Sequence, residues 1–179
     1  LETGAIIEGN TDMFDERSDA RDASKSTKPK NDIAGLSRRA DRAVIYLIKD
    51  DSGHLDTVVL PIVGSGLWDL MYGFVGLAPD LNTVQSVVYS DLKETPGLGA
   101  EVLNPKWKAL WPGKQIYQNN DVALKVIKGK VESDDAMVTY KVDGLSGATL
   151  TSRGVSNMIE YWFSESGYSS MLKELDYES

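Results

Sequence analysis

The sequence has no cysteine and only one histidine, His54, among its 179 residues. The absence of cysteine excludes disulfides, thiolate catalysis and cysteine-ligated iron–sulfur clusters in this chain. One histidine leaves too few ligands for the common zinc and haem sites. Because His54 follows the turn-forming residues 50–53, DDSG, we expect its side chain to be exposed to solvent.

Long apolar runs are also lacking. No stretch of about 18 apolar residues is present to span a membrane, and the first residues show no signal-peptide pattern. The net charge is −8 at pH 7 and no long cluster of lysine and arginine occurs, which argues against nucleic acid as a partner. With 41% hydrophobic and 26% charged residues, the composition is typical of a folded domain.

Charged residues of both signs crowd the first part of the chain. We therefore predict a charged N-terminal arm over residues 1–38 and one globular domain over residues 39–179, where apolar patterning begins. Within the arm, Ile33 and Leu36 stand at helical spacing and predict a short helix before Arg38.

Runs rich in β-branched residues predict several strands. They cover residues 44–48, 57–62, 84–89, 122–127 and 136–142. The first two runs flank a DSG turn, so we expect them to pair as an antiparallel hairpin. Residues 64–76 are interrupted by glycines and contain several aromatic side chains, and we interpret them as a short helix or packed loop under the sheet.

The clearest helix lies near the C-terminus. Its apolar residues recur at i, i+3, i+4, i+7 and i+8, at Val155, Met158, Ile159, Trp162 and Phe163. Gly167 is placed to end that helix as a C-cap, and a second short helix is predicted around residues 171–175. Antiparallel strands combined with these helices predict an α+β fold, a mostly antiparallel sheet with helices packed at its ends.

Residues 143–149, DGLSGAT, place two hydroxyls and two glycines immediately before the predicted helix. The first N–H groups of a helix are unpaired and favour an anion, so Thr149 would stand at a phosphate site. A simpler alternative needs only local structure, because Asp-Gly is a turn dipeptide and serine or threonine before a helix commonly caps it. Spacing alone does not decide between these two interpretations.

Other catalytic and phosphate-binding motifs fit less well. Residues 64–69, GSGLWD, have aspartate in place of the last glycine of the dinucleotide fingerprint, and residues 113–115, GKQ, lack the hydroxyl after the Walker lysine. Residues 144–148, GLSGA, approximate a serine-hydrolase elbow centred on Ser146. That enzyme needs a base, and His54 precedes the serine although the fold orders its triad Ser, acid, His. A serine hydrolase using Ser146 is kept as an alternative.

Three segments resemble one protein family. The DGLSGAT segment matches the pattern D-G-x-[ST]-G-A-T and resembles the flavinylation motif of membrane redox complexes. With its flanks through Val155, it is similar to the C subunit of the sodium-translocating NADH:quinone oxidoreductase (Nqr). Residues 64–74, GSGLWDLMYGF, and residues 94–101, ETPGLGAE, are similar to stretches of the same protein. The resemblance covers most of the chain from about Arg39 onward, and it implies that residues 39–179 form an FMN-binding domain.

The resemblance implies that FMN is esterified through its phosphate to Thr149, and that the loop over residues 94–99 lies against the flavin ring. By itself, that loop would equally form a surface turn around its Pro-Gly pair. The other residues that we predict to contact the cofactor on this basis are Glu94, Thr95, Leu98, Gly99, Ser146, Gly147 and Ala148.

Two more side chains are candidates for contact with the cofactor. Trp68 could lie against the flavin ring, although tryptophan in such a run commonly belongs to the core. Among Lys125, Lys128 and Lys130, which shortly precede the motif, we choose Lys128 to steady the phosphate or the ring. Each of the three lysines could instead lie on a solvated face.

By family, such a protein relays electrons from NADH toward quinone in a sodium-exporting membrane complex. The resemblance therefore implies FMN as the cofactor, other Nqr subunits as partners and a separate flavin transferase that attaches the FMN. It also implies an N-terminal membrane helix absent from this chain and a location on the periplasmic side of the bacterial inner membrane. The related Rnf complex has a comparable flavinylated protein and is the alternative, although the GLW and MYGF stretches favour Nqr.

Overall fold

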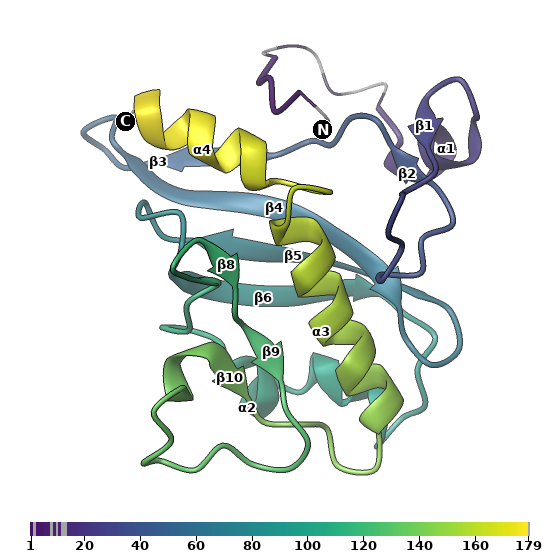
Figure 1. Cartoon of the computed structure of the whole chain (residues 1–179), viewed down its shortest axis with the longest axis vertical. Helices are drawn as coiled ribbons and strands as arrows, with labels where there is room; N and C mark the ends of the chain where they lie inside the picture. The colour runs from purple at the N-terminus through teal and green to yellow at the C-terminus, as the bar shows by residue number, and fades with distance from the viewer. Residues whose placement is uncertain (2, 8, 10, 12–13, 179) are drawn as a thin grey trace.

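The centre of the protein is a four-stranded antiparallel sheet with the strand order β3-β4-β5-β6 (Figure 1). The computed structural model describes the chain through Glu178, except residues 2, 8, 10, 12 and 13. The four strands are Tyr46–Lys49, Leu55–Ser65, Leu70–Leu77 and Val84–Asp91. The predicted hairpin is confirmed as β3 and β4, and His54 lies in its turn with 82% of its side chain exposed.

Residues 64–76 do not form the short helix or packed loop that the glycines suggested. Instead β4 continues to Ser65, and β5 returns along it with Ser65 opposite Leu70 and Val58 opposite Leu77. Glycine is needed within β5 because a neighbouring strand passes close by. A Cβ on Gly73 would lie 2.5 Å from the carbonyl oxygen of Val88 in β6. These glycines therefore accommodate strand packing rather than interrupt a strand.

Helix α3, Thr149–Phe163, lies across one face of the sheet and contacts β4 (Figure 1). Its predicted apolar stripe is confirmed, because all five residues are at most 1% exposed. The prediction of Gly167 as its C-cap is wrong, since the helix ends at Phe163 with Ser164 as the cap. The chain then turns into α4, Ser169–Glu178, which corresponds to the predicted second helix.

Short elements fill the chain between β6 and α3. They are η1 Gly99–Leu103, α2 Pro105–Lys108, β7 Tyr117–Gln118, β8 Asp121–Val122, β9 Lys125–Val126, η2 Val138–Tyr140 and β10 Lys141–Val142. The strands predicted over residues 122–127 and 136–142 are therefore too long, and β9 pairs with β10 in parallel. Asp135 explains part of the difference, because its carboxylate accepts the N–H of Met137 over 2.7 Å and forms a turn where a strand was expected.

The N-terminal segment contains α1, Glu16–Arg21, and the antiparallel pair β1, Ser26–Thr27, with β2, Arg39–Ala40. The short helix predicted around Ile33 and Leu36 is wrong. The carboxylate of Asp32 accepts the N–H groups of Leu36 and Ser37 over 2.8 and 2.7 Å, and Ser37 has a φ of 61°, so the chain forms a tight turn there.

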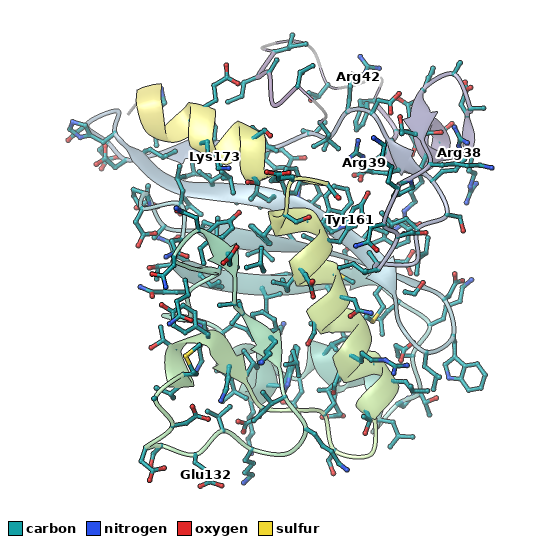
Figure 2. The ribbon with its side chains drawn as sticks, in the orientation of Figure 1. Arg38, Arg39, Arg42, Glu132, Tyr161 and Lys173 are labelled. Atoms are coloured by element: carbon teal, nitrogen blue, oxygen red, sulfur yellow. The ribbon has the colours of Figure 1, made fainter. Side chains whose placement is uncertain are left out.

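Arg39 connects this segment to the C-terminal half. Its guanidinium donates a hydrogen bond to the carbonyl oxygen of Ser166. Figure 2 shows Arg39 next to Tyr161 of α3, where its positive charge lowers the pKa of the phenol while burial raises it more strongly. The α+β fold class is confirmed by this arrangement. Within the described residues, no helix combines the length and the apolar character that crossing a bilayer requires.

Candidate functional site

Three segments that are distant in the sequence meet at one side of the sheet. They are the turn over residues 66–69 after β4, the loop over residues 92–98 after β6, and the loop over residues 143–148 that leads into α3 (Figure 1). A Cβ on Gly147 would lie 2.9 Å from the Cδ2 atom of Leu98. The structure therefore brings together the three segments that carry the family resemblance.

The buried carboxylate of Glu94 connects its own loop to the turn over residues 66–69 and to the first turn of α3. Glu94 is only 7% exposed. Its Oε1 atom accepts the backbone N–H groups of Leu67 and Trp68 over 2.8 and 3.2 Å, and its Oε2 atom accepts the hydroxyl of Thr151 over 2.5 Å. Both oxygens are thus engaged within the protein, and direct contact between Glu94 and a flavin stays a prediction.

Two glycines leave the space that this carboxylate occupies. A Cβ on Gly66 would lie 2.4 Å from Oε1 of Glu94, and a Cβ on Gly99 would lie 2.2 Å from Oε2 and 2.6 Å from the hydroxyl oxygen of Thr151. Real Cβ atoms do not approach oxygen so closely. Gly99 was predicted to contact the cofactor, and the structure also gives it this packing role.

Helix α3 begins without a side-chain cap. Its N-cap residue is Ala148, and Thr149 is the exposed first residue of the helix. Among the described residues, the backbone N–H groups of Thr149, Leu150 and Thr151 donate no hydrogen bond. The alternative in which Ser146 or Thr149 serves as the helix cap is therefore wrong. The helix start offers unpaired donors, which is the property that a phosphate needs.

The loop before the helix is held to the first turn of α3 by a hydrogen bond. Gly147 has a φ of 72°, which permits the turn that follows the exposed Ser146. The N–H of Leu145 donates to the Oγ atom of Ser152 over 2.9 Å. Thr151 and Ser152 were not among the predicted site residues, although they immediately follow the motif and carry hydroxyls that could have indicated such a role.

Trp68 lies at the surface, with 68% of the residue exposed. Its indole Nε1 donates a hydrogen bond to the Oγ1 atom of Thr95 over 3.2 Å. The alternative that placed Trp68 in the core is wrong. Other large apolar side chains around the site are also exposed: Leu67 45%, Leu98 42% and, in the first turn of α3, Leu150 47%.

Lys128 lies in an exposed loop beside the motif. The N–H of Gly144 donates to the carbonyl oxygen of Gly129 over 2.8 Å, and a Cβ on Gly144 would lie 2.3 Å from the carbonyl oxygen of Ile127. The backbone of this loop is therefore packed against the motif. A contact between the side chain of Lys128 and the cofactor stays a prediction.

The serine-hydrolase alternative lacks its base in this structure. His54 is in the β3–β4 turn and Ser146 precedes α3, and Figure 1 places these segments on opposite sides of the molecule. The imidazole of His54 lies 3.7 Å from the carboxylate of Asp50 in its own turn. The described residues also contain no group of three histidine, aspartate or glutamate side chains that could hold a metal ion.

The site has hydrogen-bond donors that fit the phosphate of FMN and apolar surface that fits its ring. Unpaired N–H groups at the start of α3 suit a phosphate, and the exposed hydroxyl of Thr149 lies beside them. Trp68 and Leu98 supply exposed apolar surface of the kind that a flavin ring would cover. Residues 66–164 match the FMN-binding domain family.

Comparison with whole proteins gives the same assignment. The chain is 49% identical over 145 residues to the C subunit of the Na(+)-translocating NADH-quinone reductase of Pseudomonas aeruginosa, covering 80% of this chain and 55% of that protein. It is 42% identical to the corresponding protein of Vibrio alginolyticus, covering 98% of this chain and 68% of that protein. The chain thus spans between about half and two thirds of these relatives' lengths.

Solved structures agree with this result. The crystal structure of Shewanella oneidensis NqrC is 39% identical and superposes with a TM-score of 0.92, covering 98% of this chain and 81% of that chain. The corresponding protein from Parabacteroides distasonis is 26% identical, with a TM-score of 0.69 and coverage of 96% and 74%. These relatives support the Nqr assignment rather than the Rnf alternative. The chain belongs to the NqrC family, the C subunits of the sodium-translocating NADH-quinone reductases, and its cofactor is FMN.

Proposed function

We propose that this chain carries FMN covalently bound through a phosphoester to Thr149 and serves as an electron-transfer subunit. The main support for this proposal is the geometry at the start of α3. There the exposed Thr149 stands beside three N–H groups that donate to no partner among the described residues, on a helix whose N-cap is an alanine. Such a helix end stabilises the phosphate charge, and a covalent bond keeps the cofactor in place even where noncovalent contacts are weak.

No base for this threonine is found in the described part of the chain. Within the described residues, the hydroxyl of Thr149 makes no hydrogen bond to a carboxylate or imidazole. Unperturbed alcohols are weak nucleophiles and need such a partner. We therefore expect a separate flavin transferase to form the bond between Thr149 Oγ1 and the phosphorus of the FMN group. In the same step the bond from that phosphorus to the leaving group of the flavin donor breaks, and a base of the transferase accepts the hydroxyl proton.

Bound FMN supplies the electron chemistry, and the protein supplies orientation and environment. Trp68 and the 94–99 loop would flank the ring, while the first turn of α3 holds the phosphate. By analogy with the named relatives, the electrons pass from NADH toward quinone, with the other Nqr subunits as partners. The proposal includes an N-terminal membrane helix outside this chain and a location on the periplasmic side of the inner membrane.

The test is co-production of the chain with a flavin transferase. We expect a yellow protein band that survives denaturation, and a mass increase of FMN minus water on the peptide that contains Thr149. Thr149→Val should abolish both signals. Thr57→Val is the matched control, because it removes a hydroxyl that bonds to Gln85 within the sheet, outside the three site segments. An unlabelled wild-type peptide, or a label that persists in T149V, would overturn the proposal.

A further inference from the structure

We propose that Glu94 and Thr151 are positioning residues for the flavin attachment site. Their hydrogen bond fixes the first turn of α3 so that Thr149 faces outward with its N–H groups open. This inference rests on the proposed function, since it requires Thr149 to be the attachment point. It assigns to Glu94 a role through Thr151 rather than direct contact with the flavin.

Helix geometry explains how one bond can orient another residue. Successive residues of an α-helix are about 100° apart, so Thr149 and Thr151 point about 200° apart around the axis. Thr151 is 1% exposed, whereas Thr149 lies at the surface. If Thr151 is held inward by Glu94, Thr149 is turned toward solvent. A first turn that rotated or frayed would lose this orientation.

The start of α3 depends on such a restraint because it has no cap of its own. Uncapped helix ends leave their first N–H groups unpaired and fray readily. Two side-chain hydrogen bonds tether this turn in the described structure, from Thr151 to Glu94 and from the N–H of Leu145 to Ser152. The Thr151 bond is the one that ends on a charged group, and bonds to charged groups are stronger than neutral ones.

The carboxylate in turn depends on its three donors. In the described part of the chain, no lysine or arginine forms an ion pair with Glu94. A buried charge without a counter-ion needs hydrogen bonds to replace water, and here the donors are Leu67, Trp68 and Thr151. Loss of the Thr151 hydroxyl would therefore also weaken the hydrogen bonds by which Glu94 fixes the turn at Leu67 and Trp68.

The same carboxylate thus links the two ends of the site. One oxygen holds the turn that carries Trp68, and the other holds the turn that presents Thr149. A substitution at Thr151 should consequently be detected at Trp68, although Thr151 makes no described hydrogen bond to it. A residue that merely stabilised α3 would not have this effect.

The test compares Thr151→Val and Glu94→Gln with the wild type. Valine keeps the shape of threonine but removes the hydroxyl that donates to Glu94. Glutamine keeps an oxygen that can accept the N–H groups of Leu67 and Trp68, but it places an amide group toward Thr151. We expect the rate of FMN incorporation by a purified transferase to fall about tenfold in T151V, the scale of one lost hydrogen bond to a charged group. The emission of Trp68 in the apoprotein should change as well, and Thr151→Ser should restore both.

Thr57→Val provides the control for a threonine hydroxyl lost elsewhere, and it should incorporate FMN at the wild-type rate. If wild-type Thr149 is not labelled, the proposed function fails and this inference fails with it. If the wild type is labelled and T151V is labelled at the same rate with unchanged Trp68 emission, only the positioning role is overturned. Failure of both T151V and E94Q to fold would also overturn it, because the pair would then support the whole domain rather than this turn.

Discussion

The indole of Trp68 donates a hydrogen bond to the hydroxyl of Thr95 over 3.2 Å, although 68% of Trp68 is exposed. The chain has four tryptophans, and Trp107, Trp111 and Trp162 are 7%, 0% and 1% exposed. A surface indole without a partner samples several rotamers. Thr95 therefore restricts the ring on the surface where we place the flavin.

Fluorescence quenching tests this arrangement. In the apoprotein, Trp68 should account for the tryptophan emission that acrylamide reaches, because the other three indoles are buried. Trp68→Phe should remove that quenchable component and shift the remaining emission to shorter wavelength, and attached FMN should protect Trp68 in the wild type. Equal quenching of the wild type and W68F would contradict the structure, and Trp107→Phe serves as the buried control.

Helix α3 approaches the end of β4 too closely for a side chain at Gly154. A Cβ there would lie 2.2 Å from the carbonyl oxygen of Ser65. Alanine usually stabilises a helix interior by about 0.5–1 kcal/mol relative to glycine. Here the obstacle is backbone and cannot rotate away, and overpacking costs roughly 1–3 kcal/mol. The steric cost should exceed the gain in helix propensity.

We therefore expect Gly154→Ala to lower the free energy of unfolding by roughly 1–2 kcal/mol, measured by urea denaturation. Arg153→Ala, at the exposed neighbouring position, should change it by no more than about 0.5 kcal/mol. A G154A variant as stable as the wild type would show that α3 and β4 are not in this close contact.

The parts of the fold that the sequence predicted well depend on local patterns. The β3–β4 hairpin follows from two β-branched runs around a turn, and α3 follows from apolar residues at helical spacing. The strand β5 was missed because its glycines were interpreted as interruptions. Glycine is required in β5 because the backbone of β6, including Val88, lies close to it. No local sequence pattern shows which strand will lie next to β5.

At the candidate site too, local sequence patterns predicted only part of the structure. The DGLSGAT motif located the start of α3 and the exposed Thr149, and the structure places Leu98 of the 94–99 segment close to Gly147 of this motif. Contact of either segment with the flavin stays a prediction. The part played by Thr151 was not predicted. Its partner Glu94 is 57 residues away in the chain, and the direction of each side chain depends on how α3 packs against the sheet.

Glu16 lies at the start of α1 and lines a cavity of about 260 Å³ together with Arg17, Arg39 and Trp162. Burial raises the pKa of its carboxyl group from 4.5 to about 7, and the positive charge of Arg17 offsets only part of that shift. The native state therefore retains a proton that the unfolded chain releases at lower pH. The stability that this proton contributes is complete below the unfolded pKa and is lost as the pH rises through about 7.

Glu16→Gln should remove this pH dependence, because glutamine resembles the protonated carboxyl group. At pH 4, below the unfolded pKa of 4.5, E16Q and the wild type should have nearly equal free energies of unfolding. At pH 8, E16Q should be more stable by roughly 1–3 kcal/mol, since the wild type must then bury a charge or take up a proton. Urea denaturation at both pH values measures the difference in free energy of unfolding between E16Q and the wild type. The contributions of other titrating groups cancel in this difference.

Glu132→Gln, at an exposed carboxylate (Figure 2), controls for the loss of one negative charge. A difference between E16Q and the wild type that is the same at pH 4 and pH 8 would show that Glu16 is solvated rather than buried.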